Sequence, residues 1–574
     1  MRLKYKISLA IILLLMVGCF MTYQSYALYV ANLSGNDNNL NIGCFAIEFS
    51  ESSSSISLDN TYPISDTKGL TIAPYTFTIT NKCTTAASYS VILSSLTTNG
   101  IGDNNIKYAI YETTKPSSGT LLTSATSYTD ISNLANVKNR KNSYQVATGG
   151  LKGAPEENGT GGSKTYNLIL WLDEATGNDA MGKTFSASVN VVSAGGEYTP
   201  TAVEKITELA QTDTTNLAID DYGNTRYIGK DPNNYVRIEE EEYAGNVYYG
   251  YYDTTSTRYK EYSSLEECTS ASSYNVNCKL AKTKGTPILW RIIGVMKDID
   301  DGTGNKEDRI KLIRSEPIGG YSWDTSESSV NDGRGVNEWS QADLMKLLNP
   351  GYESESVGGS LYWNHQSGTC YSGRNNGTKA CDFTSTGIKD KLKTFIGDAA
   401  WNTSSQEAKD GKAYTFDNII TSKFYELERS TNTGKICSST GRYGSYCNDT
   451  VERTTTWTGK VGLMYPSDYG YATSGGSTTD RATCLKKELF RWNSSNVSDC
   501  KNNDWLFNGD YQFTISPSAN TYGADFVINV APSGSIANDG TGSTLLVQPV
   551  VYLASNMKIS GGEGTSESPY QLES

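Results

Sequence analysis

The chain has 574 residues, with 62 acidic against 49 basic side chains and a formal net charge of −13 at pH 7. This balance argues against nucleic acids and anionic membranes as partners, because proteins bind both through clusters of Lys and Arg. At roughly 150 residues per domain, the length predicts several structural units.

The N-terminal 27 residues are typical of a secretory signal peptide. Three basic residues precede an apolar run over residues 7–21, and Ser25-Tyr26-Ala27 has the small-x-Ala pattern of a cleavage site. The run is short for a membrane span, although an uncleaved anchor is the alternative. We expect a mature protein of residues 28–574 with a net charge of −16, without a membrane span, either released or held noncovalently at the cell surface.

Ten cysteines remain after Cys19 leaves with the signal peptide. An even number in a secreted chain predicts disulfide-closed loops and leaves no thiol for catalysis. Sequence alone allows other connectivities, and the simplest joins neighbours: Cys44/Cys83, Cys268/Cys278, Cys370/Cys381, Cys437/Cys447 and Cys484/Cys500.

Residues 28–195 predict an all-β domain. Apolar and polar residues alternate over residues 75–79, 89–93, 166–172 and 185–191, with Gly- and Asn-rich turns between them. Short strands at this spacing favour an antiparallel sandwich or a jelly roll.

Three segments between residues 25 and 191 read SYALYVANLSGNDNNLNIGCFAIEF, IAPYTFTITNKCTTAASYSVIL and YNLILWLDEATGNDAMGKTFSASVNV. In these segments the chain resembles the TasA/camelysin family of Gram-positive secreted proteins. The resemblance implies a jelly-roll domain, export and, as in some members, self-assembly into biofilm-matrix fibres. Cys44 and Cys83 are not expected from it.

Residues 177–184, GNDAMGKT, satisfy the P-loop expression G-x-x-x-x-G-K-T. A P-loop holds phosphate only where a helix follows the glycines. Here an alternating strand begins at Phe185, so we predict a hairpin turn and no nucleotide site.

Residues 196–225 predict a linker with one short helix. Thr201 and Glu204 have the spacing of a capping box, and apolar residues between 203 and 210 fall on one side of the helix. We expect this helix to pack on one neighbouring domain.

Residues 226–574 predict a disulfide-stapled α+β domain. Residues 238–287, with four consecutive glutamates and the YYGYY run, predict an insertion. The expected strands are residues 288–296, 309–318, 461–465, 525–530 and 545–553, and the expected helices are residues 340–348, 388–396 and 416–427.

The blocks TRYIG, NYV, LWRIIGV, VGLMYPSDYGYA and QPVVYL occur in this domain. In these blocks it resembles an uncharacterised family of secreted Gram-positive proteins, which implies no activity. More distantly it is similar to C-type-lectin-like and formylglycine-generating-enzyme-like domains. Asn503-Asp504-Trp505 does not have the residue order of the lectin calcium motif.

A displayed loop over residues 467–475 is the leading candidate for ligand binding. It is rich in Tyr and Gly and follows a predicted buried strand. The ring of Tyr can stack on a sugar ring or a protein surface while its hydroxyl stays hydrated. The ordinary composition of a β domain is the alternative explanation for these tyrosines. The predicted ligand-binding residues are Tyr465, Asp468, Tyr469, Tyr471 and Trp505.

Other chemistry has little support. The single histidine, His365, removes most histidine-based mechanisms, and we predict no cofactor except calcium. Asp298, Asp300 and Asp301 crowd a turn between two predicted strands and offer the oxygen ligands that calcium takes. A solvated hairpin turn is the alternative for these three residues.

We therefore predict a secreted bacterial surface or matrix protein whose C-terminal domain binds a glycan or a protein, without catalysis. One alternative is an extracellular polysaccharide hydrolase with a carboxylate pair drawn from Asp324, Glu327, Glu338 and Asp343. Another is a structural fibre subunit.

Overall fold

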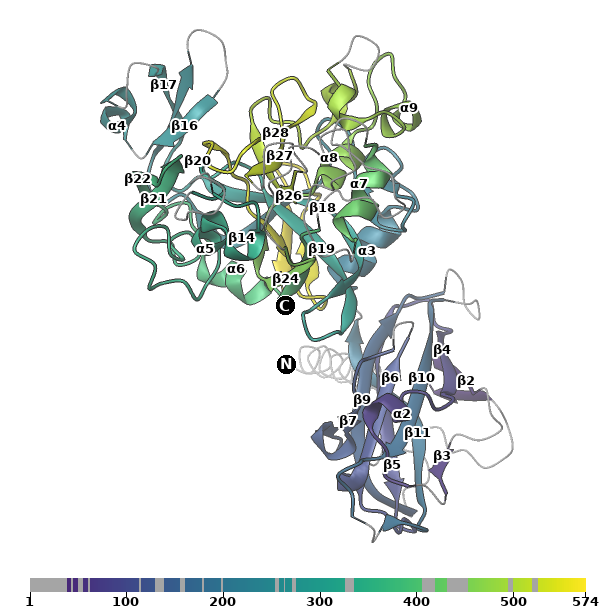
Figure 1. Ribbon diagram of the computed structural model, residues 1–574. Helices are drawn as coiled ribbons and strands as arrows, with labels where there is room; N and C mark the ends of the chain where they lie inside the picture. Colours follow the sequence, from purple (N-terminus) through teal and green to yellow (C-terminus); the bar gives the residue numbers. More distant parts are fainter. Residues whose placement is uncertain are drawn as a thin grey trace, which may run out of the picture. The chain divides into compact units, whose positions relative to one another are not determined.

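The computed structural model describes residues 39–42, 45–49, 55–59, 62–112, 115–129, 139–154, 161–177, 180–197, 200–252, 258–262, 264–270, 275–325, 335–404, 419–430, 453–493, 499–518 and 525–573. The predicted signal peptide, Cys44, Cys437 and Cys447 lie outside these residues. The chain forms two compact units, Met1–Thr199 and Pro200–Ser574, which can be followed by colour in Figure 1.

The N-terminal unit consists of two antiparallel β-sheets. The first has the order β1 (Asn39–Ile42), β2 (Phe45–Phe49), β4 (Tyr75–Asn81), β10 (Ser163–Leu172), β6 (Ile106–Tyr111) and β7 (Thr120–Leu121). The second has the order β3 (Ser55–Leu58), β11 (Phe185–Glu197), β5 (Ala87–Leu96), β9 (Arg140–Leu151) and β8 (Thr126–Ser127). Three short helices, α2 (Asp66–Gly69), η1 (Asp103–Asn105) and η2 (Leu122–Ser124), lie in the connections.

The two sheets pack face to face on a shared hydrophobic core. In β4, Tyr75, Phe77 and Ile79 are buried, while the threonines between them are half-buried. Val91 of β5 and Val189 of β11 join the same core from the other sheet. Because side chains alternate along a strand, each sheet buries one face against the other. The predicted all-β unit is confirmed.

The P-loop-like segment lies between β10 and β11. A strand follows it from Phe185, as predicted. The predicted hairpin is wrong, because β10 and β11 belong to different sheets and do not pair with each other. The connection passes from one sheet to the other, most of its described residues are exposed, and the carbonyl of Thr184 accepts the N–H groups of Gly100 and Ile101.

The C-terminal unit is built on a mixed nine-stranded sheet with long central strands. Its order is β25 (Val461–Gly462), β30 (Val550–Tyr552), β19 (Lys306–Arg314), β18 (Pro287–Asp300), β14 (Tyr235–Glu242), β32 (Tyr570–Glu573) and β31 (Lys558–Gly561), with β13 (Thr225–Tyr227) on β18 and β12 (Leu217–Ile219) on β13. The LWRIIGV block forms the middle of β18, as its apolar run predicted. β14 and β32 pair in parallel, which places the C-terminal strand between β14 and the edge strand β31.

Smaller sheets surround this one. A five-stranded sheet has the order β20 (Gly320–Tyr321), β29 (Leu545–Leu546), β26 (Gln512–Pro517), β27 (Phe526–Val530) and β28 (Ile536–Gly540). Two ribbons pair β21 (Ser367–Gly373) with β22 (Gly377–Asp382) and β23 (Ala399–Asn402) with β24 (Thr456–Gly459). The predicted insertion contains its own sheet, in the order β16 (Arg258–Tyr262), β15 (Val247–Tyr252) and β17 (Asn275–Lys282), which projects from the unit in Figure 1.

Helices in the C-terminal unit are short, so the unit is mainly β. They are α3 (Ala202–Leu209), α4 (Leu265–Ser270), α5 (Asp343–Leu348), α6 (Asp390–Phe395), α7 (Thr421–Glu428), α8 (Pro466–Ala472) and α9 (Arg481–Leu485), with 3-10 turns η7 (Trp339–Gln341), η9 (Leu489–Arg491) and η10 (Cys500–Asn503). Helices α5 and α6 lie within the predicted helical segments, α7 overlaps the third and ends one residue beyond it, and α5 ends before Pro350, which cannot continue a helix.

The segment predicted as a linker largely belongs to the C-terminal unit, which begins at Pro200. The capping box is confirmed: the Thr201 hydroxyl accepts the N–H of Glu204, and the Glu204 carboxylate accepts the N–H of Thr201. Ile206 of α3 is buried in the core of this unit with Leu217. The apolar side of the helix therefore packs on the C-terminal unit from its first turn.

Three of the predicted disulfides are confirmed: Cys268–Cys278, Cys370–Cys381 and Cys484–Cys500. Cys83 is also disulfide-bonded. No helix in the described part of the chain is long and apolar enough to cross a membrane.

Candidate functional site

The predicted displayed loop at residues 467–475 is wrong over most of its length, because residues 466–472 form helix α8 and all seven are buried. Pro466 occupies the first turn, where its missing N–H costs no hydrogen bond. Tyr469 packs against Trp492 with ring centroids 5.4 Å apart and donates its hydroxyl to the carbonyl of Gly534 at 2.7 Å. The tyrosines of this segment, which were predicted to form a ligand-binding surface, are core residues.

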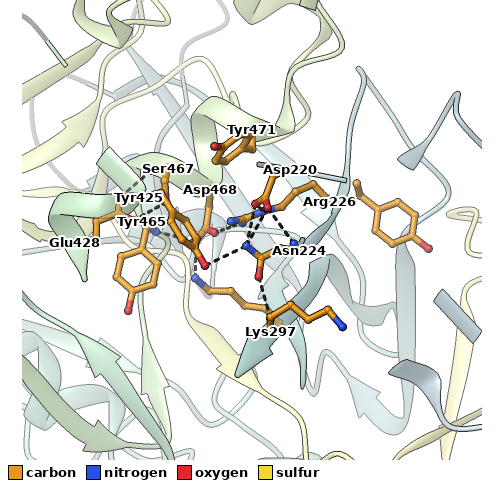
Figure 2. Close-up of polar contacts among 12 residues, drawn as sticks. Asp220, Asn224, Arg226, Lys297, Tyr425, Glu428, Tyr465, Ser467, Asp468 and Tyr471 are labelled. Carbon is orange, nitrogen blue, oxygen red and sulfur yellow. Dashed lines mark hydrogen bonds and ion pairs between the residues drawn. The ribbon is translucent and has the colours of Figure 1, made fainter. Parts of the chain in front are cut away.

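Asp468 lies at the centre of a buried charge network, drawn in Figure 2. One carboxylate oxygen pairs with Nη1 of Arg226 at 2.6 Å and the other with Nζ of Lys311 at 2.5 Å. Arg226 Nε also pairs with Asp220 at 2.9 Å. Burial alone would raise the pKa of Asp468, but Lys311 and Arg226 lower it to about 2. Asp468 is therefore ionised at neutral pH, and it joins α8 to β13 and β19, which lie far apart in sequence.

The basic partners respond differently to burial. Desolvation lowers the pKa of Lys311 to about 8 even though Asp468 favours its charged form. Arg226 keeps a pKa above its ordinary value, because Asp468 and Asp220 outweigh the effect of burial. Of these two partners of Asp468, Lys311 loses its proton more easily, while Arg226 stays charged at all physiological pH values.

A second acid extends the network. Glu428 accepts the N–H of Ser467 at 2.9 Å and its hydroxyl at 2.5 Å, and it pairs with Arg429 at 3.1 Å. Burial raises the pKa of Glu428 to about 7, against the opposite effects of Arg429 and Ser467. Asn224 connects the ion pairs around Arg226 with helix α7, because its side-chain amide donates to Asp220 and to the hydroxyl of Tyr425.

This network has balanced formal charge and is largely buried. Its acids are Asp220, Asp468 and Glu428, and its bases are Arg226, Lys311 and Arg429. The acids and bases are ion-paired with one another, Asp468 is only 2% exposed, and the Arg429 side chain is 23% exposed. The contacts of the network hold α7, α8, β13 and β19 together, which is a structural role.

All five predicted ligand-binding residues are buried, and none faces solvent as a binding surface would. The four in and before α8, Tyr465, Asp468, Tyr469 and Tyr471, are at most 2% exposed. Trp505 is 9% exposed and donates Nε1–H to the carbonyl of Tyr227 at 2.9 Å. Its indole contacts the guanidinium of Arg291, 4.5 Å from the ring centroid, and that arginine leads to the surface.

An open cleft of about 450 Å³ lies in the C-terminal unit where the main sheet meets the base of the insertion. Strands β14 and β18 form its floor, and the loop at residues 566–569 forms one wall. Its lining is largely polar: Tyr235, Arg237, Tyr243, Lys282, Thr286, Pro287, Leu289, Arg291, Ser315, Glu316, Ser566, Glu567 and Pro569.

Arg291 in the floor of the cleft is held on three sides. Its guanidinium lies 4.1 Å from the ring centroid of Tyr235 as well as 4.5 Å from that of Trp505. Nε donates to Asn234 at 2.8 Å and Nη2 to Asp231 at 2.9 Å. Desolvation lowers the pKa of Arg291, partly offset by Tyr235 and Asp231. The side chain is therefore fixed in one orientation before any ligand arrives.

Ion pairs line the rim. Arg237 pairs with Glu242 at 2.9 Å, and Lys282 lies 3.7 Å from Glu316. Arg291 and Tyr235 were not among the predicted site residues, although they lie in the blocks LWRIIGV and NYV. The available signal was a charged residue in the middle of the apolar run of β18, which requires a dedicated partner when buried.

Of the three calcium candidates, Asp298 and Asp300 lie at the end of β18 and Asp301 lies in the turn to β19, and the predicted hairpin is confirmed. Asp300 accepts the N–H groups of Gly302 at 2.8 Å and Gly304 at 3.0 Å, and Asp301 accepts the N–H of Thr303 at 2.8 Å. These carboxylates stabilise the turn. Among the described residues, no cluster of three or more acidic, His or Cys side chains could hold a metal, and calcium binding by Asp298, Asp300 and Asp301 stays a prediction.

No family model matches the chain, and no match was found among curated proteins or solved structures.

Proposed function

We propose that this is a secreted bacterial surface or matrix protein whose C-terminal unit binds a glycan in the cleft above Arg291. The cleft carries the proposal. Its volume of about 450 Å³ falls within the range of roughly 300–1,000 Å³ common for ligand sites. Hydroxyl, carboxylate and guanidinium groups beside the ring of Tyr235 suit a polyhydroxylated ligand, which offers both hydrogen-bonding groups and C–H faces.

Secretion is supported by the disulfides. Three are present among the described cysteines of the C-terminal unit, and such bonds persist in oxidising compartments outside the cytosol. The signal-peptide pattern of residues 1–27 predicts the same destination.

The N-terminal unit is proposed to serve attachment or self-assembly as a jelly roll. Its two packed antiparallel sheets agree with that fold and with other sandwiches. A C-type-lectin-like topology is proposed for the C-terminal unit on the resemblance of its sequence blocks. A surface protein remains the alternative ligand of the cleft, and a structural fibre subunit remains the alternative role of the whole chain.

A polysaccharide hydrolase has weaker support. Asp324 accepts the N–H groups of Val336 and Asp343, Glu338 accepts those of Ser340 and Thr454, and Asp343 accepts that of Thr325. Burial, and next the neighbouring Asp343, raise the pKa of Asp324 to about 8. These carboxylates close loops through backbone N–H groups, and Glu327 lies outside the described residues.

A glycan array probed with residues 28–574 tests the proposal. We expect binding without release of reducing sugar. Ser566 is an exposed residue of the cleft wall, so Ser566→Trp should fill the cleft and abolish binding without changing Tm. Ser560→Trp, at an exposed position outside the cleft lining, is the matched control and should bind normally. Reducing-sugar release by the wild type would favour the hydrolase, and equal binding by both variants would place the ligand elsewhere.

A further inference from the structure

We infer that the cleft selects an acidic saccharide and that the sugar carboxylate binds the Nη1 edge of Arg291. The inference deepens the proposed function and rests on it, because it names the ligand class of the same cleft.

Arg291 has one unused donor group that reaches solvent. Nε and Nη2 are hydrogen-bonded to Asn234 and Asp231, and Nη2 also lies 3.4 Å from the carbonyl of Pro232. Within the described part of the chain, Nη1 has no hydrogen-bond partner, and it is not among the unpartnered polar atoms that are sealed from water. The side chain is 90% buried, so a rigid guanidinium presents one open edge to the cleft.

A carboxylate fits that edge better than other anions. A guanidinium binds carboxylate through charge-assisted N–H···O bonds, and the clamp formed by Tyr235 and Trp505 removes the entropy cost of ordering it. The other two cations of the lining, Arg237 and Lys282, already face Glu242 and Glu316. Arg291 is the most buried of the three cations in the described lining, and its single open edge suits one negative charge better than a phosphate dianion or a polysulfate.

The rest of the cleft suits the neutral part of a sugar. Glu316 and Glu567 can accept hydrogen bonds from ring hydroxyls, and Ser315, Ser566 and Thr286 can both donate and accept. The net charge of −13 opposes long polyanions but tolerates one carboxylate on a largely neutral oligosaccharide. An acidic peptide would place several charges beside Glu316 and Glu567, so the acidic saccharide is favoured.

The decisive comparison uses the unmodified protein. Isothermal titration of residues 28–574 with sialyllactose, which has a single carboxylate, and with its methyl ester changes only the ligand's charge. We expect the acid to bind at least about tenfold more tightly than the ester, as the loss of a charge-assisted pair predicts. An aldobiouronic acid, with one glucuronate carboxylate, against its methyl ester repeats the comparison with a different acidic sugar.

Asp231→Asn provides a second measurement. Asp231 competes for the same guanidinium and is 64% exposed, so its neutral variant should fold normally and bind the acid roughly threefold more tightly. Asp221→Asn, at an exposed residue outside the cleft lining, should leave affinity unchanged.

Each result separates the two proposals. Equal affinity for acid and ester would overturn the carboxylate inference and leave glycan binding in place. If Asp231→Asn does not increase the affinity for the acidic saccharide, the carboxylate binds away from Arg291, and the carboxylate inference is also overturned. Failure of all saccharides on the array, or capture of acidic peptides alone, would overturn the proposed function as well.

Discussion

Arg226 and Arg291 lie in paired strands of one sheet and have similar surroundings, yet they suit opposite roles. Each is a buried cation with an aspartate partner and an aromatic ring nearby. Arg226 also has an unpaired nitrogen, Nη2, but that atom is sealed from water beside Tyr471, whereas Nη1 of Arg291 reaches solvent at the cleft. Solvent access, more than residue type or charge, therefore separates a structural cation from a candidate binding group.

The largest difference between the two regions should follow from removing one acid in each. Asp468→Asn leaves Arg226 and Lys311 buried without their shared anion and should lower the free energy of unfolding by about 3–5 kcal/mol. Asp231→Asn removes an exposed partner of Arg291 and should cost less than about 1 kcal/mol. Urea denaturation measures both. If the two variants lost similar free energies of unfolding, Arg226 and Arg291 would not differ in structural role.

A pH dependence should distinguish the buried network next. The folded-state pKa of Glu428 is raised to about 7, above its ordinary value of 4.5, so the folded protein holds this proton more tightly than the unfolded chain does. The stability from this group is therefore full below pH 4.5 and is lost as pH rises through 7, by about 3 kcal/mol in all. Glu428→Gln should remove this decline in denaturation curves measured at pH 5 and pH 8.

The matched control is Glu426→Gln, in the same helix but half-exposed and paired with Lys423. It should keep the decline between pH 5 and pH 8. An identical pH profile for both variants would mean that the proton is not held by Glu428.

The smallest effects concern two tyrosines of α8. Tyr469→Phe removes a hydrogen bond and leaves the buried carbonyl of Gly534 without its donor, so it should cost about 1–2 kcal/mol. The hydroxyl of Tyr471 is buried and has no partner among the described residues, so Tyr471→Phe should be neutral or slightly stabilising. Thermal unfolding of the two variants checks this order, and the reverse order would show that Tyr471 makes a contact of its own.

Local features were predictable where the signal was local. The apolar run of β18, the capping box at Thr201 and the stop before Pro350 each depend on residues a few positions apart, and the structure confirms all three. Three of the predicted short disulfide loops are confirmed as well, and the Cys437/Cys447 loop lies outside the described residues. The β10–β11 connection was misread, because alternation predicts a strand but does not say which sheet the strand joins.

The candidate site was less predictable. Residues 466–472, rich in Tyr, Gly, Ser and Asp, have the composition of a loop, and only their neighbours make them a buried helix. Arg291 and Tyr235 were overlooked for the opposite reason. They lie in strand-forming blocks that predicted core, and the cleft above them exists only because the insertion and residues 566–569 leave that part of the sheet uncovered.

By itself, the sequence determined an acidic chain with short disulfide loops, an all-β N-terminal part and several of the principal strands of the C-terminal unit, because charge, spacing and alternation are properties of neighbouring residues. Tertiary structure decided which charges are sealed and which are open. The partners of Asp468 lie 242 and 157 residues away, and those of Arg291 include Trp505 from another part of the chain. Burial and pairing of a charge depend on such distant contacts, and no local pattern records them.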